Sequence, residues 1–574
     1  MTELKTNYYV DEIPFPEYPR PLERRKEWLN LNGKWRFAKV KQEQTPAEFQ
    51  TILVPFSPEC ANSGVGNGFT LEAGEKLVYS RVFHLQIEEN AVVLLHFGAV
   101  DHTAEVFING KSVGTHVGGY TPFTFDITPF VQDGNNELRV DVTDDPHHGA
   151  RGKQSKNPSG IWYTAHSGIW QTVWLETLPK DYIRGIRYEI DAEQKKVVLF
   201  AQSNGREQTA TVYDGETEIA CVRFTDRAEI VYDFEWWSPE NPKLYAVKLV
   251  NDGGDEVSSY FGFRTFGIGK DEQGKPRLLL NGKPYFFSGV LDQGYWSDGL
   301  LTPPCDKAMK DELKLLKAMG FNTVRKHIKI EPLRWYYHCD RLGLVVWQDF
   351  VNGGGEYKFS HIAALPFLGF RHRDDDYKYF ARENEDGRRE FRKAMDETVE
   401  ALRSFVSVGV WVIFNEGWGQ FDSARLTKRL AALDNTRIID SVSGWHDQGK
   451  EKTTLKSLHT YYTRLKVPRD PRPVVLSEFG GYSLKVSGHV YREDKEFGYK
   501  KFPSKKALNE AIEKLYAKKL KPLVKKGLCA AIYTQVSDVE EEINGLVTYD
   551  RKVVKVDTEM MKRLNLALYQ EIND

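Results

Sequence analysis

Two glutamates follow short apolar runs late in the sequence. Glu416 comes directly after Asn415 and the run at 411–414, and Glu478 comes directly after the run at 474–477. A carboxylate this close to a buried strand is desolvated unless a partner compensates its charge or a reaction uses it. Two carboxylates in one pocket are the minimum equipment for cleaving a glycosidic bond. One protonates the leaving oxygen, and the other stabilises or attacks the anomeric carbon.

Other chemistries leave recognisable motifs, and the sequence lacks them. It contains no phosphate-binding P-loop, no G-x-S-x-G elbow, no H-E-x-x-H helix and no G-x-G-x-x-G at a strand end. A site in which Glu416 and Glu478 bind a metal would need a His or Asp partner set, which the strand ends do not obviously supply. We therefore predict no metal and no cofactor.

The elements that must position these carboxylates alternate between strands and helices after residue 267. Apolar runs of four to six residues are separated by helical patterns, as in a (β/α)8 barrel, whose reactive groups lie where strands end on the C-terminal face. We predict this barrel over residues 268–574. The eight expected strands are 285–290, 322–325, 344–347, 411–414, 437–441, 457–460, 474–477 and 529–534.

The first 267 residues are typical of β-structure. Residues 137–142 alternate apolar and charged side chains, and Asn109-Gly110 is a strong hairpin signal. Residues 1–180 predict a jelly-roll β-sandwich, and residues 181–267 predict an immunoglobulin-like β-sandwich. The predicted fold class is therefore multidomain, with two β-sandwiches followed by the catalytic barrel.

The composition limits the partners. Lys and Arg number 79 against 81 Asp and Glu, so no basic excess favours nucleic acid or an anionic membrane. Five scattered cysteines indicate a reducing compartment, and with no apolar leader or spanning run we predict a cytoplasmic protein. Aromatic residues reach 13%, and some of these rings could face a ligand.

Several motifs together resemble glycoside hydrolase family 2, which includes β-galactosidases, β-glucuronidases and β-mannosidases. Phe414-Asn415-Glu416-Gly417 and Leu476-Ser477-Glu478-Phe479-Gly480 are similar to its two active-site motifs. The resemblance extends over nearly the whole chain and is also carried by residues 28–35, 167–175, 262–265, 319–325 and 339–344.

The resemblance implies roles for individual residues. Glu416 would be the general acid/base and Glu478 the nucleophile of a retaining mechanism, and Asn415 would bond the sugar 2-OH. Arg325, with Tyr461 or Tyr462, would keep Glu478 ionised. His459 could line the floor of the site.

The aromatic residues and the strand 8 position bear on the sugar. Trp296, Trp418 and Trp445 lie in loops after strands 1, 4 and 5, where each could stack on a sugar or pack its own loop. Trp347 could belong to the barrel core or to the pocket, and all four rings are candidate sugar contacts. Where many relatives place a strand 8 Trp, this chain has Gln535, which could hydrogen-bond instead.

Within the family that the chain resembles, we expect a terminal β-D-galactoside as the substrate, removed from an oligosaccharide or glycoside, although Trp347-Gln348-Asp349 looks more like β-mannosidases. A β-mannoside or a β-glucuronide is the alternative, although the Asn-x-Lys carboxylate clamp of typical β-glucuronidases is absent after Glu478. A non-catalytic carbohydrate-binding relative is the rival from another class. The large β-domains could also bury surface against a second copy of the chain, as a homo-oligomer.

Overall fold

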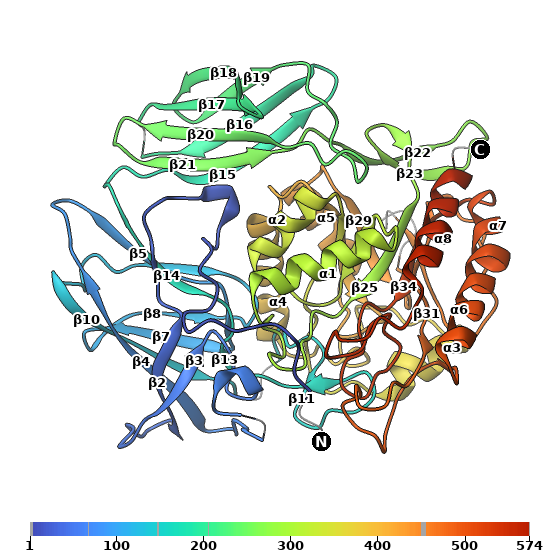
Figure 1. Ribbon diagram of the computed structural model, residues 1–574, viewed down its shortest axis with the longest axis horizontal. Helices are drawn as coiled ribbons and strands as arrows, with labels where there is room; N and C mark the ends of the chain where they lie inside the picture. The colour runs from blue at the N-terminus through green and yellow to red at the C-terminus, as the bar shows by residue number, and fades with distance from the viewer. Residues whose placement is uncertain (1–3, 67, 146–147, 205, 449–454, 573–574) are drawn as a thin grey trace.

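The computed structural model describes residues 4–66, 68–145, 148–204, 206–448 and 455–572. The chain folds into a β-sandwich, an immunoglobulin-like β-sandwich and a (β/α)8 barrel, so the predicted fold class is confirmed. In Figure 1 the blue first sandwich lies on the left, the green second sandwich lies along the top, and the barrel fills the centre and right.

The first sandwich packs two antiparallel sheets face to face. Its alternating strands place their apolar side chains between the sheets, as Leu138, Val140 and Val142 do, all fully buried. The Asn109-Gly110 turn joins β7 (Thr103–Ile108) to β8 (Lys111–Val117) with positive φ at both residues, as a tight hairpin requires. The six-stranded sheet contains, in order, β3 (Gln50–Val54), β2 (Gly33–Lys41), β4 (Glu75–Leu85), β10 (Gly134–Thr143), β7 (Thr103–Ile108) and β8 (Lys111–Val117). The four-stranded sheet contains β1 (Leu29–Asn30), β14 (Val173–Leu178), β5 (Val92–Phe97) and β9 (Phe123–Asp126).

Two short pairs of strands complete this region, and the second sandwich follows. The pairs are β6 (Val100–Asp101) with β13 (Gly168–Ile169), and β11 (Gln154–Ser155) with β12 (Tyr163–Thr164). The second sandwich has its own core, to which Leu199, Val212 and Leu249 contribute. Its three-stranded sheet contains, in order, β15 (Arg184–Asp191), β16 (Lys196–Gln202) and β19 (Arg227–Val231). Its four-stranded sheet contains β18 (Thr217–Phe224), β17 (Gln208–Asp214), β20 (Tyr245–Asn251) and β21 (Glu256–Phe261).

A small sheet leads into the barrel, whose strands all pair in parallel. The small sheet contains β22 (Phe266–Lys270), β23 (Pro276–Leu280) and β24 (Lys283–Pro284). The barrel strands are, in spatial order, β29 (Ile438–Ser443), β28 (Val408–Asn415), β27 (Val345–Asp349), β26 (Thr323–Lys326), β25 (Phe287–Asp292), β34 (Leu528–Thr534), β31 (Val474–Gly480) and β30 (Lys456–Thr460). All eight predicted strands are present. β28 begins three residues earlier than predicted because Val408 already pairs with Val346 of β27.

Side chains join the two strands at the ends of this order. Ser443 Oγ of β29 lies 2.9 Å from His459 Nε2 of β30, and Ser457 donates to Asp440 across the same seam. This seam holds His459 beside the end of β28, where Glu416 lies.

The helices cover the outside of the barrel. The principal ones are α1 (Asp306–Ala318), α2 (Leu333–Leu342), α4 (Glu385–Leu402), α5 (Ser423–Leu433), α6 (Lys505–Lys514), α7 (Lys521–Val524) and α8 (Thr558–Glu571). The bounds of α4 follow from the residues at its two ends. It begins at Glu385 because the Asn384 side chain accepts a hydrogen bond from Gly387 N, and it ends before Phe405 and Val406, which are buried in the core.

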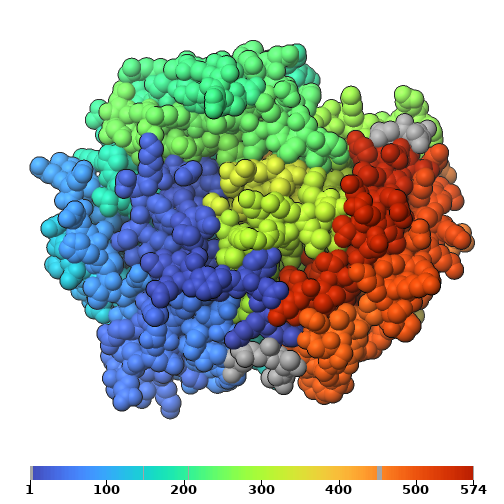
Figure 2. Space-filling view, in the orientation of Figure 1, coloured from blue at the N-terminus to red at the C-terminus, as the bar shows by residue number. Residues whose placement is uncertain are grey.

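The N-terminal segment crosses from the first sandwich to the barrel. Figure 2 shows these dark-blue residues lying across the front of the molecule, beside the yellow-green part of the barrel. The backbone N and Oγ1 of Thr6 both donate to Asp298 Oδ2, at 2.9 and 2.7 Å. Among the described residues, no helix combines the length and the apolar character needed to cross a bilayer.

Candidate active site

Glu416 and Glu478 lie together at the C-terminal mouth of the barrel. Glu478 is part of β31, and Glu416 directly follows β28, where its φ of 50° turns the chain out of the strand. Its backbone N donates to Ser443 O at 2.9 Å, which holds this left-handed conformation in place. One carboxylate oxygen of each glutamate lies within 4.8 Å of the other. The two side chains can therefore act on the same atom of a ligand.

His459 lies between the two carboxylates. Its Nδ1 is 2.7 Å from Glu416 Oε1 and 3.5 Å from Glu478 Oε2. Its Nε2 faces Ser443 Oγ, whose proton is given to Ser477 Oγ at 2.9 Å. Because the Ser443 hydroxyl already donates its proton to Ser477, it can only accept a hydrogen bond from His459. Nε2 therefore carries a proton and donates to Ser443 Oγ, and Nδ1 faces Glu416.

Arg325 and Tyr461 hold Glu478. Arg325 Nη1 lies 3.1 Å from Glu478 Oε1, and the same guanidinium makes a bidentate pair with Asp349 at 2.9 and 3.0 Å. Tyr461 donates to Glu478 Oε2 at 2.5 Å. Arg325 also donates to Asn415 Oδ1 at 2.7 Å, whereas Asn415 Nδ2 is buried and donates to no atom among the described residues.

The surroundings move the two carboxylates in opposite directions. Burial raises the pKa of Glu416 above its ordinary value, and the charge of Glu478 adds to the rise against the opposing effect of His459. Burial acts in the same sense on Glu478, but the neighbouring His459 and Arg325 outweigh it and bring its pKa below the ordinary value. One carboxyl is thus favoured as an acid and the other as an ion, the division that acid–base chemistry requires.

Among the other predicted residues, two aromatic side chains lie at the site and one does not. The Trp445 ring, half-buried, lies 5.6 Å from the His459 ring. Tyr461 is braced by Tyr499, whose ring stacks on it at 3.8 Å. Tyr462 is 67% exposed, and of the two predicted alternatives it is Tyr461 that hydrogen-bonds the carboxylate of Glu478.

The structure does not support Trp296, Trp347 or Gln535 as open ligand contacts. Trp296 is buried, with its ring edge-on to Tyr8 and its face against Arg551, because the N-terminal segment covers the loop. Trp347 is fully buried among barrel strands, 6.3 Å from the Phe287 ring. Gln535 is also fully buried, with its side-chain amide between Gln293 and Asn544.

Three residues that sequence reasoning did not assign belong to this cluster. His327 Nδ1 lies 2.7 Å from Asp349 Oδ2, and burial holds the pKa of His327 well below its usual range. Asp349 and His327 lie at the C-terminal ends of barrel strands, and this position in the sequence could have identified them as site residues. The third, Lys153, comes from the first sandwich, and no local pattern connects it to the barrel.

Glu416, His459 and Glu478 are also a group of three side chains that could hold a cation. His459 thus stands beside the two carboxylates as a histidine that a metal site would also use. The observed contacts are those of a hydrogen-bonded cluster, because His459 Nδ1 and Glu416 Oε1 are at hydrogen-bond distance and Arg325 already supplies positive charge to Glu478.

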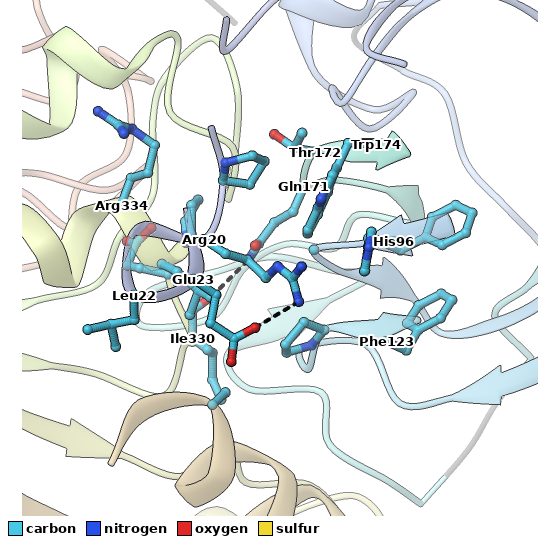
Figure 3. Close-up of a pocket in the computed structure, with 18 of the residues that line it drawn as sticks. Arg20, Leu22, Glu23, His96, Phe123, Gln171, Thr172, Trp174, Ile330 and Arg334 are labelled. Carbon is cyan, nitrogen blue, oxygen red and sulfur yellow. Dashed lines mark hydrogen bonds and ion pairs between the residues drawn. The ribbon is translucent and has the colours of Figure 1, made fainter. Parts of the chain in front are cut away.

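A separate cavity of about 330 Å³ lies where the two sandwiches meet the barrel. Figure 3 shows Arg20, His96, Phe123 and Trp174 around it, with Arg20 paired to Glu23 at 3.2 Å. None of the predicted site residues lines this cavity. The candidate chemistry therefore belongs to the barrel mouth and not to this junction.

Three family models match the chain. The model described as glycosyl hydrolases family 2, TIM barrel domain, matches residues 273–566. The sugar binding domain of the same family matches residues 64–179, and a third model, described as glycosyl hydrolases family 2, matches residues 173–264.

Curated relatives carry two kinds of name. A β-galactosidase of Thermoanaerobacter pseudethanolicus is 25% identical over 483 residues, which cover 79% of this chain and 57% of the relative. A putative β-glucuronidase of Formosa agariphila is 30% identical over 290 residues, which cover 46% of this chain and 33% of the relative. The chain thus spans only part of the length of these relatives.

Solved structures show the same fold along the whole chain. A β-D-glucuronidase of Dictyoglomus thermophilum has a TM-score of 0.74 at 18% identity, covering 95% of this chain and 98% of the other. A β-galacturonidase of Eisenbergiella tayi bound to galacturonate has a TM-score of 0.70 at 19% identity, covering 96% and 99%.

Proposed function

The chain belongs to glycosyl hydrolase family 2, and from this premise we propose that it removes a terminal β-linked sugar with retention of anomeric configuration. The observation that carries the proposal is the approach of Glu416 to Glu478. One oxygen of each carboxylate lies within 4.8 Å of one oxygen of the other, and this close approach supports a retaining pair, at roughly 5–5.5 Å between carboxyl groups, over an inverting pair, at about 6.5–9.5 Å.

In the first step Glu478 is the nucleophile. Its carboxylate, kept ionised by Arg325 and Tyr461, attacks the anomeric carbon while Glu416 gives its proton to the departing oxygen. The bond from sugar to leaving group breaks as the bond from sugar to Glu478 forms. The lowered pKa of Glu478 and the raised pKa of Glu416 suit these two roles.

In the second step Glu416 acts as a base. It takes a proton from water, the water oxygen attacks the anomeric carbon, and the carboxylate of Glu478 is released. His459 Nδ1 lies 2.7 Å from Glu416 Oε1, where it stabilises the carboxylate that Glu416 becomes after giving up its proton. The unpartnered Asn415 Nδ2 is suited to donate to the sugar 2-OH, a contact that stabilises the transition state.

The identity of the sugar is the finer part of the proposal. The names of the relatives divide between a neutral sugar, galactose, and the acidic sugars glucuronate and galacturonate. A β-D-galactoside, the substrate expected from the resemblance, stays an alternative outcome of the test below. A panel of nitrophenyl glycosides in both anomeric forms separates these classes. Release of nitrophenol from no β-anomer would contradict the proposed function and favour a carbohydrate-binding role.

The catalytic assignment is tested by Glu416→Ala with azide. We expect this variant to form the glycosyl-enzyme from activated substrates but to hydrolyse it slowly, so azide should restore turnover and yield a β-glycosyl azide. Glu385→Ala, which changes an exposed side chain at the start of helix α4, is the matched control and should behave as the wild type. An α-azide, or full activity of Glu416→Ala without azide, would overturn the assignment.

A further inference from the structure

A lysine of the first sandwich lies beside the proposed catalytic pair. Lys153 is 7% exposed, and its Nζ is 5.3 Å from the ring centroid of Tyr163 and 5.4 Å from that of Trp418. Trp418 follows Glu416 by two residues, and its ring lies 6.1 Å from His327. The ammonium group is thus held between two rings at the mouth of the barrel.

The position of Lys153 is fixed by the backbone on either side of it. The N–H groups of Arg151 and Gly152 both donate to Asn352 O of the barrel, and the Arg151 guanidinium donates to two further barrel carbonyls. Gly152 has a φ of 63°, and a Cβ there would lie 3.2 Å from Ile328 O. Glycine suits this close approach of the backbone to Ile328 because it lacks a Cβ and tolerates positive φ, so the segment can pack directly on the barrel.

Lys153 differs from the other buried lysines. Its Nζ makes no hydrogen bond or ion pair with any residue in the described part of the chain. The four other buried lysines each lie within 2.9 Å of a carboxylate oxygen: Lys326 on Asp292, Lys329 on Glu331, Lys456 on Asp447 and Lys555 on Asp538. A largely buried lysine without a counter-charge is unfavourable, so the ammonium of Lys153 is available to pair with the anion of a ligand.

The charge of Lys153 reaches the reacting groups. Burial raises the pKa of Glu416, and the nearby ammonium partly offsets that rise. The same ammonium adds to the effect of burial in lowering the pKa of His327 and opposes the effect of burial on Asp349. Asp349 itself is committed to Arg325 and His327. The contacts through Trp418 to His327 place the ammonium on the same side of the barrel as the two glutamates.

We propose that Lys153 binds a carboxylate on the sugar that Glu478 attacks, so that the natural substrate is a β-D-hexuronide. A C6 carboxylate would supply the missing counter-charge through a short charge-assisted hydrogen bond in a desolvated site. A neutral hexose offers only a hydroxyl at this place and leaves the ammonium uncompensated. The inference rests on the proposed function and names the substrate class of the same site.

The test compares nitrophenyl β-D-glucuronide, β-D-galacturonide and β-D-galactoside with wild type and Lys153→Met. We expect the wild type to prefer a uronide. In Lys153→Met, KM for the uronide should rise about 10- to 100-fold, the value of one hydrogen bond to a charged group, and kcat should fall less. Lys153→Arg should recover part of the loss. Lys156→Met is the matched control, since it removes the same charge from an exposed side chain three residues away.

The outcomes separate this inference from the proposed function. A wild type that hydrolyses the galactoside better than both uronides overturns the inference and leaves the proposed function standing, whereas no β-glycosidase activity overturns both. Should Lys153→Met fail to fold, binding to the wild type decides. Free D-galacturonate or D-glucuronate should raise Tm more than equimolar D-galactose, and an equal or smaller rise overturns the inference.

Discussion

Glu176 of the first sandwich and Glu478 of the barrel are both buried carboxylates beside an arginine and a histidine. Arg20, Arg25 and His96 lie 2.5, 3.4 and 2.9 Å from the oxygens of Glu176, and Tyr18 donates to it as well. Arg25 also pairs with Asp255 of the second sandwich, at 2.7 Å. The cluster thus ties the N-terminal segment and both sandwiches together.

The barrel cluster distributes its charges differently. Three cationic or ring nitrogens converge on one carboxylate at Glu176, whereas at the barrel mouth one histidine is shared between two carboxylates. Glu176 and Glu478 both have lowered pKa values, but beside Glu478 lies a second carboxyl, Glu416, whose pKa is raised. An excess of positive charge stabilises an ion, while sharing one histidine between two carboxyls prepares a proton transfer.

The largest effect should come from Glu478→Gln. We expect kcat to fall about 10⁵-fold because the nucleophile is lost, with Tm within about 2 °C of the wild type. Arg325 keeps its bidentate pair with Asp349 in this variant, so its buried charge still has a carboxylate partner. Steady-state kinetics on the best nitrophenyl β-glycoside and thermal unfolding measure both. Activity above a few per cent of the wild type would contradict a nucleophilic role.

The opposite result is expected for Glu176→Gln. Removing the carboxylate should lower the free energy of unfolding by about 3 kcal/mol, because Arg20 and Arg25 stay buried without it, and should leave kcat and KM unchanged. Since the pKa of Glu176 is depressed in the folded state, its stabilisation is present above its ordinary pKa and is lost as the pH falls. The difference from the wild type should therefore shrink in acid.

Urea unfolding at several pH values measures this difference. Glu23→Gln is the control, because Glu23 pairs with Arg20 from a partly exposed position and should cost no more than about 1 kcal/mol. A loss of kcat in Glu176→Gln at full folding would break the distinction between a structural and a catalytic cluster.

A smaller effect should follow His459→Gln. Activity requires Glu478 ionised and Glu416 protonated, so the acid limb of the pH profile follows Glu478 and the alkaline limb follows Glu416. His459 lowers both pKa values, and its removal should move both limbs to higher pH. We also expect kcat to fall about 10-fold, the weight of one hydrogen bond to a charged group. Limbs that move apart, or to lower pH, would contradict the sharing of His459.

Much of this arrangement could be predicted from short stretches of sequence. An apolar run followed by a polar residue marks a barrel strand and its catalytic end, which is why the eight strands and Glu416, Glu478, Asn415 and Arg325 could be predicted together. Tyr461 and Tyr462 are adjacent, and the choice between them depends on which way the chain turns after β30.

Contacts between distant segments could not be predicted in this way. Lys153 reaches the site through hydrogen bonds to residues about 200 positions later in the chain, and no local pattern encodes them. Trp296 follows strand 1 as a sugar-binding ring would, but the N-terminal segment covers it. A loop position alone does not reveal what packs on the loop.

The smallest predicted effects distinguish rings at the barrel mouth from rings elsewhere. Trp445→Ala should raise KM about 2- to 10-fold, because its half-buried ring stands beside His459 and can contact the bound sugar. Trp296→Phe should change KM less than about 2-fold, since a phenyl ring preserves the edge contact with Tyr8 away from the carboxylates. KM for the preferred nitrophenyl glycoside measures both variants. A larger change at Trp296 than at Trp445 would mean that the sugar lies nearer the loop after strand 1 than Glu416 and Glu478 imply.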